Sequence, residues 1–210
     1  RIVHGARTTV TVAFLSVAIG TGIGLLLGLV GGYFGGWLDN LIQRLAEVFL
    51  AFPGIVLAIA MVSVLGAGMD KVIIALAVSF APGSARVMRS AVLQVKGLPY
   101  VDAARAIGAA PGRIMFHHIL PNIMAPYLII FSTLLGTAIL AEASLSFLGL
   151  GVPPPAPSWG RMLSGGAQTY ALVAPHMVII PGLAISLVVF AFNLFGDALR
   201  DVWDPRLRGR

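Results

Sequence analysis

Long uncharged stretches alternate with short charged segments along the whole chain. A helix needs about 20 mostly apolar residues to cross a hydrocarbon core about 30 Å thick. Four stretches reach this length unaided, whereas 72–85 reaches it only if Lys71 and Arg86 extend their charged ends toward the membrane surfaces. The pattern therefore predicts five spanning helices. Their approximate bounds are 10–32, 48–68, 71–90, 119–148 and 172–196.

The composition favours a membrane protein over a soluble one. Hydrophobic residues make up 58% of the 210 residues and charged residues 10%, against about 25% charged residues in typical soluble domains. The longest charged connection, 86–118, is too short for a catalytic domain. We therefore expect a single domain over 1–210, an all-α integral membrane protein built as a polytopic helical bundle. Without cysteine, this chain has no disulfide, thiolate metal site or cysteine nucleophile.

The net charge of +6 bears on orientation in the membrane. Positive residues gather in the cytoplasmic connections of membrane proteins, so we do not interpret this charge as nucleic-acid binding. Placing 86–118 and the C-terminal segment after Asp197 in the cytoplasm puts ten of the 14 lysines and arginines on that side, four of them in the C-terminal segment. The N-terminus then lies outside. Because the chain begins at Arg1 and shows no signal peptide, we expect a sixth span before it.

Residues 100–122, YVDAARAIGAAPGRIMFHHILPN, differ most from the apolar sequence around them. A glycine and a proline end the preceding helix, and Asp102 falls in the first turn of a new one, where the helix dipole favours an acid. A second short helix is expected from Pro111, before Pro121 breaks the chain again. The pattern predicts a short helix lying across one mouth of the bundle.

The predicted helix is rich in small residues. On helical spacing Val101, Ala104 and Gly108 share one face, and Ala103 and Ile107 share another. Small side chains at these positions let another protein approach closely. We therefore expect this helix to contact a partner.

This segment resembles the cytoplasmic loop in the permease subunits of bacterial and archaeal ATP-binding-cassette (ABC) importers. In those subunits the loop reads E-A-A-x-x-x-G, followed after nine residues by I-x-L-P. Asp102 stands here in place of the glutamate, and His118 in place of the isoleucine. The positions on this register are Asp102, Ala103, Ala104, Gly108, Leu120 and Pro121.

Three further blocks resemble the subfamily that imports dipeptides, oligopeptides and, in some members, nickel. The blocks read GGYFGGWLDNLIQRLAEVFLAFPGIVLAI, LAEASLSFLGLGVPPPAPSWGRML and FNLFGDALRDVWDPRLRGR. They occur in the family's order, and the similarity covers essentially the whole chain. Within the subfamily the chain is most similar to the second of the two permease subunits.

The resemblance implies a bundle of the ABC importer permease type that forms half of a pathway for dipeptides or oligopeptides, with nickel or another small solute as the alternative. The implied partners are a second homologous permease, two ATP-binding subunits, an external solute-binding protein and the cytoplasmic membrane of a bacterium or archaeon. ATP and magnesium would bind to the ATP-binding subunits. This chain has no G-x-x-x-x-G-K-[ST] phosphate loop and is not expected to be an enzyme. The implied ATPase-coupling residues, in the loop 97–118 and just after it, are Asp102, Ala103, Ala104, Arg105, Gly108, Leu120 and Pro121.

Glu142 is the one acid embedded in a predicted apolar span. An intramembrane carboxylate is costly unless it has a partner or faces a cavity. Glu142 and Ser144 are therefore candidates for the pathway or for the contact with the second permease. The alternative is a structural position near the outer surface, with Glu142 bonded to Ser144 or to the local backbone.

Gly20, Gly24 and Gly28 have the four-residue spacing that lets membrane helices pack closely. They mark either a contact with the second permease or, more simply, packing within this chain. The proline-rich segment 149–171 predicts a stiff cap over one end of the bundle. His176, which follows it, is either a gate or, more simply, an interfacial residue with satisfied hydrogen bonds.

Asp39, Arg44 and Glu47 form a charged patch in the first cytoplasmic connection, where Arg44 and Glu47 have the spacing of a helical ion pair. The patch is either a second contact with the ATPase or a solvated face. His117 and His118 are adjacent and point about 100° apart on a helix, so we expect no shared metal site.

Two other classes of function are alternatives to an ABC importer permease. An ATP-independent channel or secondary transporter usually shows broken helices, intramembrane charges or paired repeats. Here Glu142 alone is expected to lie deep, and the sequence contains no evident repeat. A membrane-embedded enzyme would need a nucleophile with a base, or a metal cluster, and the sequence offers neither.

Overall fold

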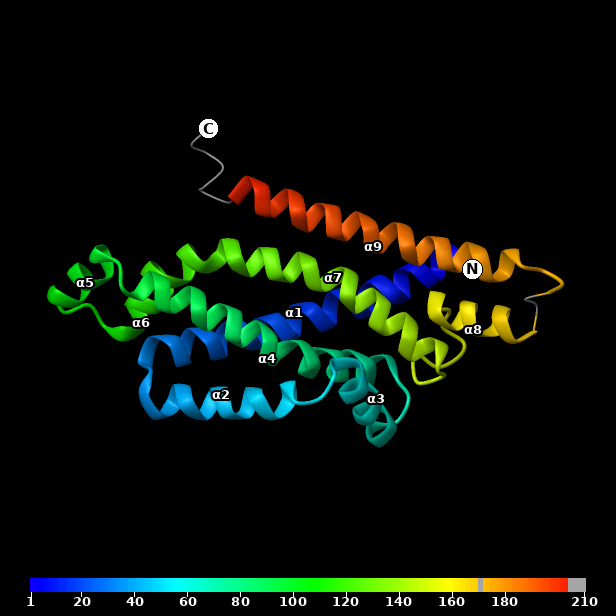
Figure 1. Cartoon of the computed structure of the whole chain (residues 1–210), viewed down its shortest axis with the longest axis horizontal. Helices are drawn as coiled ribbons and strands as arrows, with labels where there is room; N and C mark the ends of the chain where they lie inside the picture. The colour runs from blue at the N-terminus through cyan, green and yellow to red at the C-terminus, as the bar shows by residue number, and fades with distance from the viewer. Residues whose placement is uncertain (170–171, 204–210) are drawn as a thin grey trace.

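The structure, a computed structural model, describes residues 1–169 and 172–203, and this part of the chain is helical with no strand. Its long helices form an elongated bundle (Figure 1) and are α1 (Ile2–Phe34), α4 (Met69–Lys96), α7 (Met124–Phe147) and α9 (His176–Trp203). Its shorter helices are α2 (Gly36–Leu50), α3 (Gly54–Leu65), α5 (Pro99–Ala106), α6 (Pro111–Arg113) and α8 (Trp159–Thr169). The all-α bundle is confirmed. The tail 204–210, with three of the four arginines of the C-terminal segment, lies outside the described residues.

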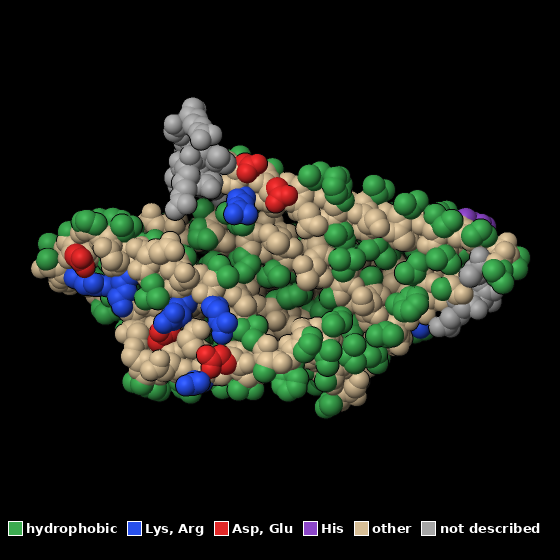
Figure 2. All heavy atoms as spheres, viewed as in Figure 1, with side chains coloured by type: hydrophobic (Ala, Val, Ile, Leu, Met, Phe, Trp, Pro, Cys, Tyr) green, Lys and Arg blue, Asp and Glu red, His purple; other side chains and the backbone are tan. Residues whose placement is uncertain are grey.

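The two ends of the bundle are built differently (Figure 1). At one end α5 and α6 precede a π-helical segment, Ile114–Ile119, and a 3₁₀ segment, Leu120–Ile123, that lead into α7; this is called the α5 end. At the other end α8 lies beside the starts of α1 and α9; this is called the α8 end. On the face shown in Figure 2, acidic and most basic side chains gather in the half that holds the α5 end.

Candidate membrane spans are recognised by length and hydropathy. Among the described residues, α1, α4, the stretch Pro111–Phe147 and α9 pass this test, and α2 with α3 passes only as a pair bent by 85°. The stretch 48–68, predicted as one span, is thus divided between the end of α2 and the whole of α3. Pro53 accounts for the break, because proline lacks an N–H and disfavours helical geometry at the residue before it.

Two long helices extend beyond their predicted ends. Helix α4 was expected to end at residue 90 and runs to Lys96, and α9 was expected to end at residue 196 and runs to Trp203. An uncharged stretch measures the part of a helix that fits in hydrocarbon. It does not mark the end of the helix, because charged residues continue a helix readily once it leaves the membrane.

The glycines of α1 pack against α4. A Cβ atom at Gly24 would lie 2.5 Å from the Cβ of Ser84 and 2.8 Å from the backbone nitrogen of Ala85. A Cβ atom at Gly28 would lie 2.7 Å from the carbonyl oxygen of Ala85. Only glycine allows the two backbones to come this close. The simpler interpretation of the glycine spacing, packing within this chain, is therefore confirmed.

An ion pair joins α2 to α4 at the level of these glycines. The Arg89 guanidinium donates two hydrogen bonds of 2.6 Å each, one to each carboxylate oxygen of Asp39. Arg44 and Glu47 form the predicted helical pair at 3.1 Å on the exposed face of α2. The predicted patch of three is therefore split, because Asp39 is buried and turned toward α4.

The segment between α7 and α8 folds back onto the bundle. Ser158 and Trp159 are buried, and the Trp159 indole Nε1 donates to the carbonyl oxygen of Ile2 at 3.0 Å. Arg161 Nη1 donates to the carbonyl oxygen of Val152 at 3.0 Å. These bonds fix the proline-rich segment against the starts of α1 and α8, so it forms the cap expected from its composition.

Candidate functional site

Helix α5 begins and ends where its sequence directs. Leu98 is extended and Pro99 takes the first helical position, where a missing N–H costs nothing. Asp102 lies in the first turn and Arg105 in the last, each at the end that suits its charge. Their side chains also meet, with Arg105 Nη1 3.0 Å from Asp102 Oδ1.

The two faces of α5 have different environments. Val101 and Ala104 are buried in a hydrophobic cluster with side chains of α1, α4 and the π-helical segment. Ala103 and Ile107 face outward, and Ile107 is 85% exposed. The face predicted from Val101 and Ala104 thus holds the helix in place, and the face of Ala103 and Ile107 is the one available to a partner.

Gly108 ends α5 in a left-handed conformation. Its φ is +77°, a region that glycine enters without strain. The Gly108 N–H donates to the carbonyl oxygen of Arg105 at 2.9 Å, and the Ala109 N–H donates to that of Ala104 at 3.0 Å. These are the two hydrogen bonds of a Schellman cap. The glycine of the motif is therefore required by the end of the helix itself.

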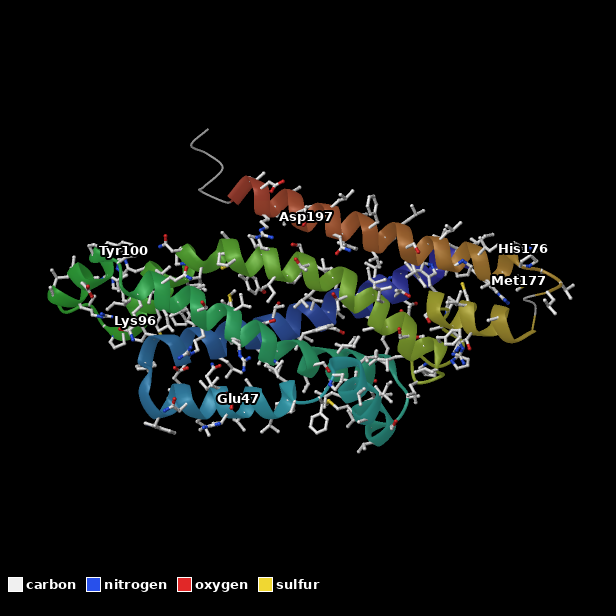
Figure 3. All side chains as sticks on the ribbon, viewed as in Figure 1. Glu47, Lys96, Tyr100, His176, Met177 and Asp197 are labelled. Carbon is white, nitrogen blue, oxygen red and sulfur yellow. The ribbon has the colours of Figure 1, made fainter. Side chains whose placement is uncertain are left out.

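Lys96 anchors this region and was not singled out from the sequence. Its ammonium group donates to the carbonyl oxygen of Tyr33 at 2.6 Å, and so satisfies an end carbonyl of α1. The same ammonium lies 5.7 Å from the centre of the Tyr33 ring, and the Arg105 guanidinium lies 5.9 Å from it. Figure 3 shows Lys96 beside the base of α5. The sequence could have indicated a role for Lys96 because it lies in the last turn of α4. It could not have indicated the partner, Tyr33, which is 63 residues away in the chain.

The second half of the motif, residues 118–121, contacts the α5 region mainly through the backbone of His118. Leu120 is half-buried against the cluster under α5, whereas Pro121 is exposed at the start of the 3₁₀ segment. The carbonyl oxygen of His118 accepts hydrogen bonds from Asn122 Nδ2 at 2.7 Å and from the Tyr100 hydroxyl at 3.4 Å. These bonds use the backbone of His118 and not its side chain. They therefore form equally well with histidine at the position where the family motif has isoleucine.

Exposed apolar side chains surround α5. They are Leu98, Tyr100, Ile107 and Phe116. Tyr100 is on α5, Leu98 and Ile107 are at its two ends, and Phe116 is on the π-helical segment; the inner face of α5 is fixed by the buried cluster. A rigid apolar surface rimmed by charges is typical of a protein docking site.

Glu142 lies near the C-terminal end of α7 and is fully buried. Its Oε1 accepts a 2.6 Å hydrogen bond from Ser146, and the buried side chains of Thr9 and Ser158 lie next to the same carboxyl group. Ser144 is exposed, and its hydroxyl donates to the carbonyl oxygen of Leu140 instead. The alternative in which Glu142 bonds to Ser144 is therefore wrong; its partner in the described structure is Ser146. Glu142 therefore connects α7 to α1 and the cap.

Comparisons with known proteins agree with this geometry. Residues 20–209 match the family described as binding-protein-dependent transport system inner membrane component. The chain belongs to this family. It is 47% identical over 208 residues to the glutathione transport system permease protein GsiD of Pectobacterium atrosepticum, and 47% identical over 209 residues to that of Escherichia coli. The alignments cover 99% and 100% of this chain and 69% of each relative.

Solved structures show the same fold. An inward-facing structure of the MetNI methionine ABC transporter matches with a TM-score of 0.75 at 24% identity, over 97% of this chain and 96% of that one. An amino acid ABC transporter with histidines matches with a TM-score of 0.69 at 18% identity, over 95% and 92%. The family match and the relatives at 47% identity show that this protein is a permease subunit of an ABC importer. As a member of that family it is a multi-pass inner-membrane protein that works with ATPase subunits and a solute-binding protein.

Proposed function

We propose that this permease imports short peptides and that the α5 end receives force from an ATPase subunit. The observation that carries the second part is that α5 is fixed by its buried inner face while Ile107, at its C-terminal end, is exposed. Support for the first part is the identity of 47% to permeases named for glutathione, which is itself a tripeptide.

The coupling mechanism follows from how α5 is mounted. Its inner face packs on the end of α4 and on the segment leading to α7, in a cluster that also includes Leu29 of α1, so a push on its outer face reaches these helices. Two such permeases side by side would form the pathway, and closure of two ATPase subunits would rock them between inward-open and outward-open states. ATP and magnesium bind to those subunits, and this chain performs no hydrolysis.

The positive charge supports a cytoplasmic position for the α5 end. The segments that form that end carry Lys96 at the end of α4, Arg105 on α5 and Arg113 on α6. The rule that cytoplasmic connections are positive then puts the α8 end outside, where a solute-binding protein docks. Peptides are favoured over nickel because the permeases to which this chain is 47% identical are named for glutathione, a tripeptide.

A copurification experiment tests the coupling surface. The full-length permease is expressed with its partner subunits, extracted gently and isolated by a tag. We expect the wild type to retain the ATPase and Ile107→Asp to lose it, because the charge falls on the docking face and disturbs no contact within the chain.

The matched control is Val173→Asp, at the opposite end of the bundle, where the side chain is 87% exposed. It should retain the ATPase. A folded Ile107→Asp variant that keeps its ATPase would contradict the assignment of α5. A Gly108 variant is a poorer test, since it also removes the cap that ends the helix.

A further inference from the structure

A cavity of about 910 Å³ opens at the α8 end of the chain. Its walls are the start of α1, the proline-rich segment 154–158, α8 and the start of α9. Figure 3 shows His176 and Met177 at the start of α9, beside α8. The volume falls within the range of about 300–1,000 Å³ that is typical of small-molecule sites.

The titratable side chains that line the cavity are all basic. Arg1 directly precedes α1, His4 comes from α1, Arg161 from α8 and His176 from α9. No aspartate or glutamate is among the described residues that line it. The arginines contribute positive charge and the histidines contribute ring N–H donors. The 28-residue helix α9 also points its positive N-terminal end toward this space.

Apolar groups make up most of the remaining wall. They are Ile2, Met162, Met177, Ile180 and the prolines at 154, 155, 157 and 181. A site with a few cationic groups and a large apolar surface suits a ligand that has an anionic end and an apolar body.

Arg161 is the best placed of the basic groups. Its Nη1 donates to the carbonyl oxygen of Val152, which holds the side chain against the cap. A guanidinium has five N–H groups, so this bond leaves others for a ligand. Arginine pairs with a carboxylate through two parallel hydrogen bonds, which gives both affinity and orientation.

We propose that this cavity binds the C-terminal carboxylate of a short peptide at the outer mouth of the permease, with Arg161 as its main partner. The proposal rests on the proposed peptide-import function. It adds a site within this chain that distinguishes a free carboxylate from a blocked one and favours solutes with an apolar side chain next to it. His176 is then part of a binding surface and not a gate.

Direct binding in the assembled importer tests this site. The permeases and ATPase subunits are reconstituted in lipid nanodiscs without the solute-binding protein, and the binding of trialanine and of trialanine amide is measured by calorimetry. We expect the wild type to bind the acid more tightly than the amide. Arg161→Gln should weaken binding of the acid about tenfold or more and leave binding of the amide unchanged.

Two further variants keep the test independent of folding. Ile180→Glu places a negative charge in the cavity and should weaken binding of the acid only. Lys71→Gln removes a cation that lies outside the cavity and pairs with Asp70. It should change the binding of neither trialanine nor trialanine amide. Equal losses for acid and amide in Arg161→Gln, or no loss for either, would overturn the proposal.

Anionic lipid is the competing occupant, and the same preparation tests it. If Arg161→Gln lowers the amount of phosphatidylglycerol retained by the complex while trialanine binding is unchanged, the cavity is a headgroup site and the proposal is wrong. Uptake of trialanine by the complete wild-type importer distinguishes failure of the proposed carboxylate site from failure of the proposed peptide-import function. Uptake with binding insensitive to Arg161→Gln refutes the site alone, whereas absence of uptake refutes the peptide function.

Discussion

Asp39 and Arg89 show how a charged pair is accommodated inside an apolar bundle. The Asp39 side chain is 9% exposed and that of Arg89 is 32% exposed, and both carboxylate oxygens are used by the guanidinium. The desolvation cost of such a pair is large, so the pair is more important for holding α2 in one position than for net stability. Arg44 and Glu47 on the same helix are solvated and contribute little.

Removal of one partner from the Asp39–Arg89 pair should destabilise the protein. We expect Asp39→Asn to lower the free energy of unfolding by about 2–3 kcal/mol, toward the low end for a buried pair because water reaches part of Arg89. The thermal midpoint of the purified protein in detergent measures the effect. Glu47→Gln is the control and should shift the midpoint very little. An equal shift in both variants would show that the buried pair has no special role.

Glu142 shows what sequence reasoning achieves at a single residue and where it stops. The sequence marked it as an unusual acid in a span, and the structure gives it a partner four residues along the helix, Ser146. Residues four apart on a helix are neighbours and residues two apart are not, so Ser146 and not Ser144 could have been predicted. The approach of Thr9 and Ser158 could not, because it depends on how the cap folds back.

Among the helices, too, local features could be predicted from the sequence and contacts between distant segments could not. Hydropathy is a local property, so the uncharged stretches correctly placed α1, α4, α7 and α9. The break between α2 and α3 was hidden, since residues on both sides of Pro53 are equally apolar. The pairing of α1 with α4 was suggested by glycine spacing alone, which shows that a helix packs closely but does not say against what.

The contact between α1 and α4 can be tested within one helix. Gly24 lies against Ser84 and Ala85, whereas a Cβ atom at Gly22 would meet nothing within 4 Å. Gly24→Ala should destabilise the bundle by about 1–3 kcal/mol through overpacking. Gly22→Ala should be neutral or stabilise it by up to about 1 kcal/mol, since alanine favours helix.

Thermal unfolding in detergent, read from the size-exclusion peak after heating, compares these two variants. The prediction concerns the difference between them, which cancels the general effect of replacing glycine in α1. Similar midpoints for both would mean that the helices separate enough to admit a methyl group at no cost.

At the scale of the whole molecule, the α5 end and the α8 end must lie on opposite sides of the membrane if one receives force and the other receives solute. The long helices connect the two ends, and their charges are distributed unequally between them (Figures 1 and 2). The positive-inside rule predicts a cytoplasmic α5 end, which is the orientation that the proposed mechanism needs. A reversed orientation would place the ATPase contact outside the cell and would therefore exclude the mechanism.

The absence of cysteine from this chain makes its orientation directly measurable. Ile107→Cys and Val173→Cys each introduce one thiol at a position more than 80% exposed, at the α5 end and the α8 end respectively. A maleimide that cannot cross membranes is added to spheroplasts that express the full-length permease without its ATPase and without other cysteines. We expect labelling of Val173→Cys in intact spheroplasts, and labelling of Ile107→Cys only after permeabilisation, because the membrane separates the two positions. The opposite pattern would invert the topology, and labelling of both in intact spheroplasts would show that the helices between them do not span the membrane.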